Sequence, residues 1–220
     1  MTALTAPAQT GTSSPNSAAP GATSPAVATS PVAAPSAQPN EAEMMKQMME
    51  LAKTNDNHKL LASTAGTWNY TVKMWMNPDP NAKPQESKGT ATRKMVLDGR
   101  YLTGDYAGKM QMPGPDGKMK EFTFHGMGVE GFDNVKQKFF ATWIDNMGTG
   151  IEISEGTYDP ATKSFTYTSE IEPVPGFKQP VREVIKVADK DHMMLEWYEN
   201  AGSPKERKTM EIDYTRAGKH

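Results

Sequence analysis

Apolar and polar residues alternate from Gly66 almost to the end of the chain, and turn-forming residues interrupt the alternation every eight to fourteen residues. In the first such segment, Trp68 and Tyr70 alternate with Asn69 and Thr71. Successive side chains of a β-strand point to opposite faces, so this pattern predicts strands with one buried face each. It predicts an all-β domain.

The turns between these segments predict how the strands connect. Asp98-Gly99 and Asp116-Gly117 are typical of hairpin turns, because Gly adopts the positive φ that such turns require. No connection is long enough for a crossover helix, so the strands must pair antiparallel with their neighbours in sequence. We expect about ten strands, near residues 66–76, 86–97, 100–112, 119–130, 136–145, 149–158, 163–171, 180–188, 191–199 and 206–216.

Ten antiparallel strands either stack as two sheets or close into a barrel. Closure is favoured because it leaves no exposed sheet edge, and because a helix expected over residues 41–54 precedes the first strand and can cover a barrel end. We therefore predict an up-and-down antiparallel β-barrel over residues 65–217, with a helical segment over residues 41–64 before it.

The predicted helix has a clear start and one apolar face. Asn40 and Glu43 form the pattern of an N-terminal capping box. Met44, Met48 and Leu51 recur at helical spacing, and we expect the face that they form to dock on the barrel. A shorter helical turn is expected near residues 58–61.

Residues 1–40 contain no charged residue and consist mainly of Ala, Pro, Ser and Thr. Such a segment buries too little apolar surface to offset the entropy of ordering it, so we expect a disordered tether. Residues 1–22 contain neither a basic region nor a continuous apolar run. We expect a periplasmic or extracellular protein if a signal peptide has been removed, and a cytoplasmic one otherwise.

Composition excludes several classes of function. The chain has 24 basic and 26 acidic residues without a basic block, which argues against nucleic acid as a partner. It has no Cys, so disulfides, thiolate metal sites and catalytic thiols are excluded. No apolar run approaches the roughly 18 residues of a membrane-spanning helix, so no membrane span is expected. The oligomeric state stays open.

Five short motifs carry a resemblance to a known family. They occur in the order LASTAGTW (61–68), LDGRY (97–101), GFDN (131–134), WID (143–145) and YTR (214–216). In this order and spacing they resemble a bacterial lipocalin-like, calycin-type family catalogued only as a domain of unknown function. The resemblance covers about residues 57–217 and implies an up-and-down β-barrel without an established activity.

The resemblance also implies a structural role for three residues. Gly66 and Trp68 match the G-x-W signature of lipocalins at the start of the first strand. In calycins this Trp packs under a basic residue from the end of the barrel. By that resemblance Trp68 would pair with Arg216, or less favourably with Arg207.

A barrel of this size can enclose one small ligand, which gives our leading hypothesis: non-catalytic binding or transport of a small apolar or amphipathic molecule. His125, in a strand rich in Phe and Gly, could bind the polar end of a ligand. Arg182 would suit a carboxylate headgroup if it points inward. The candidate cavity-lining residues are Tyr70, Phe124, His125, Trp143, Tyr167, Arg182 and Trp197.

We expect no cofactor and no metal site. The four His residues lack metal-ligand spacing. Heme would require an accessible axial ligand, for which His125 is the best candidate. Copper(I) could bind the thioethers of the methionines at 44–49, although an apolar helix face explains the same spacing.

Two alternatives to a binding protein remain. The first is an enzyme that uses His125 and cavity carboxylates on a small substrate; Asp105, Asp145, Glu152 and Glu196 are candidates, although no catalytic motif supports it. The second is a fully packed barrel with a structural or interaction role.

Overall fold

The computed structural model describes residues 40–79 and 81–218, so the tether expected over residues 1–40 lies, apart from Asn40, outside the described residues. Two helices come first, α1 (Glu41–Leu51) and α2 (Asp56–Ser63). Ten strands follow: β1 (Gly66–Met74), β2 (Gln85–Val96), β3 (Tyr101–Pro113), β4 (Met119–Asp133), β5 (Lys138–Asp145), β6 (Glu152–Asp159), β7 (Ser164–Val174), β8 (Phe177–Val187), β9 (His192–Glu199) and β10 (Arg207–Arg216).

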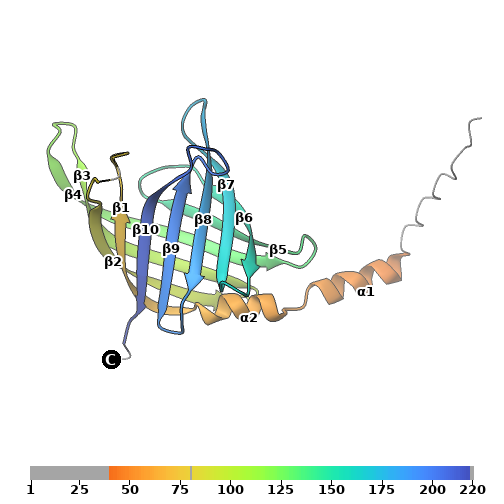
Figure 1. Ribbon diagram of the computed structural model, residues 1–220. Helices are drawn as coiled ribbons and strands as arrows, with labels where there is room; N and C mark the ends of the chain where they lie inside the picture. The colour runs from red at the N-terminus through yellow and green to blue at the C-terminus, as the bar shows by residue number, and fades with distance from the viewer. Residues whose placement is uncertain (1–39, 80, 219–220) are drawn as a thin grey trace, which may run out of the picture. The chain divides into compact units, whose positions relative to one another are not determined.

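The ten strands form one closed antiparallel barrel (Figure 1). Each strand pairs with its neighbours in sequence, and β1 closes the barrel by pairing with β10, where Tyr70 lies opposite Tyr214. The predicted up-and-down barrel is therefore confirmed. The Asp98-Gly99 turn adopts the expected left-handed conformation, with φ of 56° and 79°.

An apolar core fills the barrel near α2. Figure 1 shows α2 lying across the lower ends of the strands. Its Leu61 is completely buried and packs in one cluster with Leu102, Phe132 and Phe139. The covering of a barrel end by a helix was expected, but α2 provides it and not the longer α1.

α1 has the predicted capping box between Asn40 and Glu43, with Asn40 Oδ1 accepting from the Glu43 backbone at 3.0 Å. Its apolar face does not dock on the barrel, which corrects the prediction: Met44 and Met48 are about half exposed, at 49% and 59%. The helix also ends at Leu51, because the chain turns there into the separate cap of α2.

None of the helices in residues 40–79 and 81–218 has the length and hydropathy needed to cross a lipid bilayer.

Candidate functional site

Beyond the core at the α2 end, the barrel encloses a cavity of about 350 Å³. Tyr167 and Ile185 belong both to the core and to the cavity wall, so the cavity begins directly against the core. Its volume lies within the range of about 300–1,000 Å³ that small-molecule sites occupy. The interior of the barrel is therefore not filled throughout.

Seven aromatic side chains from different strands form much of the cavity wall. The Tyr106 and Trp143 rings meet edge to face with centroids 5.0 Å apart, and Trp143 stacks on Phe124 at 6.3 Å. Strand alternation sends these rings inward from β3, β5 and β4. The aromatic members of the wall are Tyr70, Tyr106, Phe124, Trp143, Tyr167, Trp197 and Tyr214.

Glycines on the inner face make room for these rings. A Cβ atom at Gly126 would lie 2.4 Å from Cζ2 of Trp143, and one at Gly89 would lie 2.3 Å from the Tyr70 hydroxyl. Larger residues at these positions would push the rings into the cavity. Small residues opposite large ones therefore maintain the open space.

One ion pair lies on the inner face. Arg93 of β2 is buried, and its Nη2 donates to Glu130 Oε1 of β4 at 2.5 Å. The two strands are separated by β3, where the residue paired with Arg93 is Gly104, which has no side chain to block the contact. Desolvation is the largest single effect and opposes the charge of Arg93, but Glu130, together with Tyr106, Tyr214 and Tyr167, outweighs it, so the pKa of Arg93 lies above its ordinary value.

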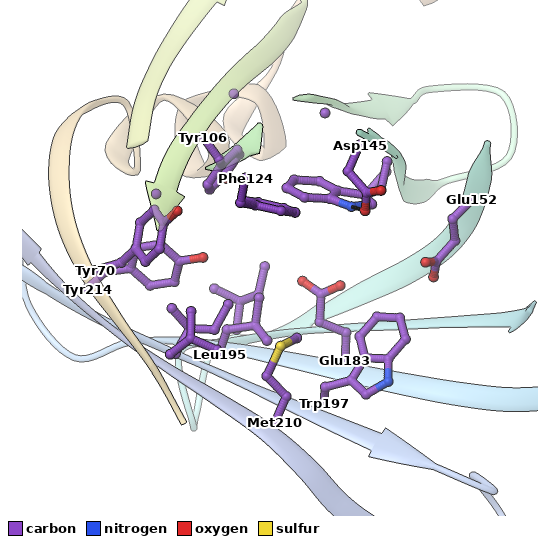
Figure 2. Close-up of a pocket in the computed structure, with 18 of the residues that line it drawn as sticks. Tyr70, Tyr106, Phe124, Asp145, Glu152, Glu183, Leu195, Trp197, Met210 and Tyr214 are labelled. Atoms are coloured by element: carbon purple, nitrogen blue, oxygen red, sulfur yellow. Dashed lines mark hydrogen bonds between the residues drawn. The ribbon is translucent and has the colours of Figure 1, made fainter. Parts of the chain in front are cut away.

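Glu183 of β8 points into the cavity between its cross-strand neighbours Tyr167 and Trp197 (Figure 2). Burial raises the pKa of Glu183 to about 8, and the charges of Glu130 and Glu152 add to this effect, while Arg93 opposes it. At neutral pH Glu183 is therefore largely a neutral acid that can donate a hydrogen bond.

Two more carboxylates face the same space, as Figure 2 shows. Asp145 accepts a hydrogen bond from Trp143 Nε1 at 2.9 Å. Glu152 accepts one from Ser169 Oγ at 2.6 Å, and burial raises its pKa. These contacts hold both carboxylates at the cavity wall.

Two buried polar atoms at the wall lack a hydrogen bond of normal geometry within the described chain: Tyr167 Oη and Arg93 Nε. Tyr167 is only 1% exposed, and burial raises the pKa of its hydroxyl well above the ordinary value. A buried polar atom without a partner is costly, so atoms of this kind commonly mark the position of a ligand or ordered water.

Five of the seven predicted lining residues face the cavity: Tyr70, Phe124, Trp143, Tyr167 and Trp197. The other two do not, which corrects the prediction.

His125 is exposed on the outer face of β4, because the inner face of that strand carries Phe124 and Gly126. It therefore cannot serve as an axial heme ligand inside the barrel. Nor can it join the cavity carboxylates in catalysis.

Arg182 also points outward. Its Nη2 pairs with Glu206, and its guanidinium lies over the Tyr198 ring with Cζ 3.9 Å from the centroid. The neighbouring Glu183 takes the inward position instead. The condition under which Arg182 would meet a carboxylate headgroup is therefore not fulfilled, and an acid of the same strand faces the cavity.

Of the four carboxylates proposed for catalysis, Asp145 and Glu152 line the cavity. Asp105 is exposed on β3, and Glu196 pairs with Lys208 at 2.9 Å outside the cavity.

The sequence analysis missed the inward position of Arg93 and Glu130. Both have apolar or glycine neighbours two residues away on each side: Ala91 and Met95 flank Arg93, and Gly128 and Phe132 flank Glu130. Because residues two apart share a face, this spacing could have placed both charges inside.

The G-x-W residues lie at the α2 end of the barrel. Arg216 lies over the fully buried Trp68, with Cζ 4.2 Å from the ring centroid, which is the pairing that the family resemblance implies. Arg216 Nη1 also donates to the Ala65 carbonyl at 2.7 Å. Gly66 has a φ of 135°, and a Cβ atom there would lie 2.1 Å from Arg216 Nη1, so this position requires glycine.

Comparison with known families identifies one match. The model of the family described as "Protein of unknown function (DUF1579)" matches residues 53–216, which include α2 and all ten strands of the barrel. No curated protein matches the chain significantly.

Proposed function

The chain belongs to the DUF1579 family, a lipocalin-like barrel family of unknown function, and for this member we propose non-catalytic binding of a small apolar or amphipathic molecule inside the barrel. One observation carries the proposal: a cavity of about 350 Å³ that is walled by aromatic rings and contains unpartnered polar atoms. Burial of apolar ligand surface would provide the affinity, at roughly 25 cal/mol per Å², and the polar groups would orient the ligand.

The arrangement supports a binding site better than a catalytic one. Glu183 and Glu152 have raised pKa values, which acid–base catalysis can use. Among the described residues, the inner face has one hydroxyl paired with a carboxylate, Ser169 with Glu152, but Ser169 is not part of the cavity wall, and His125 faces away.

Filling the cavity tests the proposal. Ala141 lines the cavity, and Ala141→Phe would occupy part of the space. We expect quenching of intrinsic tryptophan fluorescence by lipophilic ligands in the wild type and a large loss of affinity in Ala141→Phe. Thr168→Phe, which adds the same ring to the exposed face of β7, is the matched control and should bind normally.

The cavity tryptophans provide a second readout. Trp197→Ala should weaken ligand binding without unfolding the barrel, because Trp197 contributes wall and not core. Equal affinity in wild type, Ala141→Phe and Trp197→Ala, with all three folded, would show that ligands bind elsewhere.

A further inference from the structure

The charges on the inner face of the barrel are unequal. Four carboxyl groups line the cavity, from Glu130, Asp145, Glu152 and Glu183, against the single guanidinium of Arg93. That guanidinium is already paired with Glu130 at 2.5 Å. The remaining three carboxyl groups have no cationic partner among the described residues.

Two lysines also border the cavity, but strand alternation places their side chains on the outer face. The Lys109 ammonium pairs with Glu121 at 2.8 Å on that face, and Lys88 is exposed. They therefore do not neutralise the cavity carboxylates.

A polar atom without a partner lies beside the carboxyl groups. Tyr167 Oη, in a side chain that is 99% buried, faces the cavity next to its cross-strand neighbour Glu183 and has no hydrogen bond of normal geometry in the described chain. The cavity thus offers a ligand two polar atoms without a hydrogen bond of normal geometry, Tyr167 Oη and Arg93 Nε, beside an excess of carboxyl groups.

We propose that the ligand of this cavity is an organic cation, a small amphiphile whose ammonium group lies among Glu183, Glu152 and Asp145 while its apolar part contacts the aromatic wall. This inference rests on the proposed function and specifies its ligand class. The ring faces of Trp197 and Trp143 add to the attraction, since a cation is drawn to the electron-rich face of an indole.

A metal ion fits the same residues poorly. Within the described residues, no three His, Asp or Glu side chains converge in an arrangement that could hold a metal ion. An ammonium group is larger and interacts with spaced carboxylates through charge and not through a tight ligand shell.

An anionic amphiphile such as a fatty acid fits worse still. Its carboxylate would meet Glu130 at the paired guanidinium, and Glu183 and Glu152 beyond it. Above about pH 8, where Glu183 is ionised, repulsion among like charges at low effective dielectric opposes that placement.

Three probes of equal chain length test the ligand class. Decyltrimethylammonium has a permanent positive charge, decanol is neutral and decanoate is negative. Titrations are made at about pH 9, where Glu183 is ionised, and below the micelle concentration, and are followed by tryptophan fluorescence and calorimetry. They should give the order cation, alcohol, anion in decreasing affinity, with the cation at least about tenfold tighter than the anion.

The pH dependence of decyltrimethylammonium affinity tests whether Glu183 interacts with the bound cation. The groups that face it are Tyr167, Trp197, Glu130, Glu152 and Arg93, with the hydroxyls of Tyr106 and Tyr214 also nearby. Raising the pH from about 6 to about 9 ionises Glu183 and should increase affinity for decyltrimethylammonium about tenfold if the bound cation lowers the pKa of Glu183 by one unit.

Glu183→Gln should remove this pH dependence and should weaken cation binding at about pH 9 by a much larger factor than it changes decanol binding. Glu86→Gln, on the exposed face of β2, is the matched control and should behave as the wild type. Far-UV circular dichroism verifies that each variant is folded.

The outcomes separate the two proposals. Binding of none of the three probes would overturn the proposed function as well. Binding of decanol or decanoate as tightly as the cation would overturn the cationic class and leave ligand binding intact. A pH dependence that persists in Glu183→Gln would overturn the role of Glu183.

Discussion

Glu183 stays protonated in the barrel at a pH at which a glutamate side chain in water is ionised. It is an acid on an inward strand position, next to Tyr167 and Trp197, and near two further carboxylates. Water cannot stabilise its charge there, so its pKa rises to about 8 from an ordinary value of 4.5. The folded protein therefore holds a proton that the unfolded chain releases at neutral pH.

This difference predicts a pH-dependent stability. Between about pH 4.5 and pH 8 the folded state binds one proton more than the unfolded state at this site, so the free energy of unfolding falls as the pH rises. Glu183→Gln should match the wild type near pH 5 and exceed it by on the order of 4 kcal/mol near pH 9, at about 1.4 kcal/mol per pKa unit. Urea denaturation at both pH values checks this, and a difference that does not vary with pH would contradict it.

Removing Arg93 from its buried ion pair with Glu130 should lower the free energy of unfolding. Arg93→Met leaves Glu130 without its cation inside the barrel, and we expect a loss of about 3–5 kcal/mol in unfolding free energy. Lys109→Met breaks the exposed pair with Glu121 and should cost less than about 1 kcal/mol. Chemical denaturation of both variants makes the comparison; equal losses would show that the Arg93 pair is not buried as described.

The sequence predicts residue positions well where one face of a strand is distinctly apolar. In β4, Phe122, Phe124 and Gly126 share a face, so the pattern correctly placed Phe124 inside. The inward prediction for His125 was wrong, because the residue between Phe124 and Gly126 points the opposite way. In β8 both faces contain apolar residues, since Val181 and Ile185 alternate with Val184. The pattern there does not determine the face, which is why Arg182 was expected inside.

At the level of elements, the two helices differ in what they contribute. α2 buries Leu61 completely in the core, whereas no residue of α1 is buried. The short segment between them is held to the barrel by Asn134, whose Nδ2 donates to the carbonyls of Leu51 at 2.8 Å and Lys53 at 2.7 Å.

The helices therefore respond differently to truncation of an apolar side chain. Leu61→Ala should lower the unfolding free energy by about 2–5 kcal/mol because it opens a cavity in the core. Met48→Ala, on the exposed face of α1, should change it by no more than about 0.5 kcal/mol. Thermal or urea unfolding compares the two variants, and a large loss for Met48→Ala would reveal packing of α1 that the fold does not show.

Helix periodicity and caps were sufficient to predict α1, because these signals are local. They could not predict whether its apolar face is buried, because docking depends on the shape of a surface far away in sequence. The strands could be predicted in the same way, because alternation is a local signal. The cavity could not, because its volume depends on how rings and glycines from several strands fit together.

For the molecule as a whole, closure of the sheet produces both the stability and the site. Because β1 pairs with β10, inward residues from all parts of the chain meet in one enclosed space. Packing near α2 fills one part of that space, and glycines keep the rest open. The barrel thus encloses a cavity whose wall contains aromatic rings and charged side chains.

Native mass spectrometry tests that central claim most directly. We expect wild-type protein, purified gently or incubated with an extract of small apolar molecules, to carry one adduct per chain that leaves on denaturation, and Ala141→Phe to carry none. Solvent extraction of the adduct would then identify it. Wild-type protein that stays free of adducts after incubation, or adducts equally abundant in Ala141→Phe, would contradict binding inside the barrel.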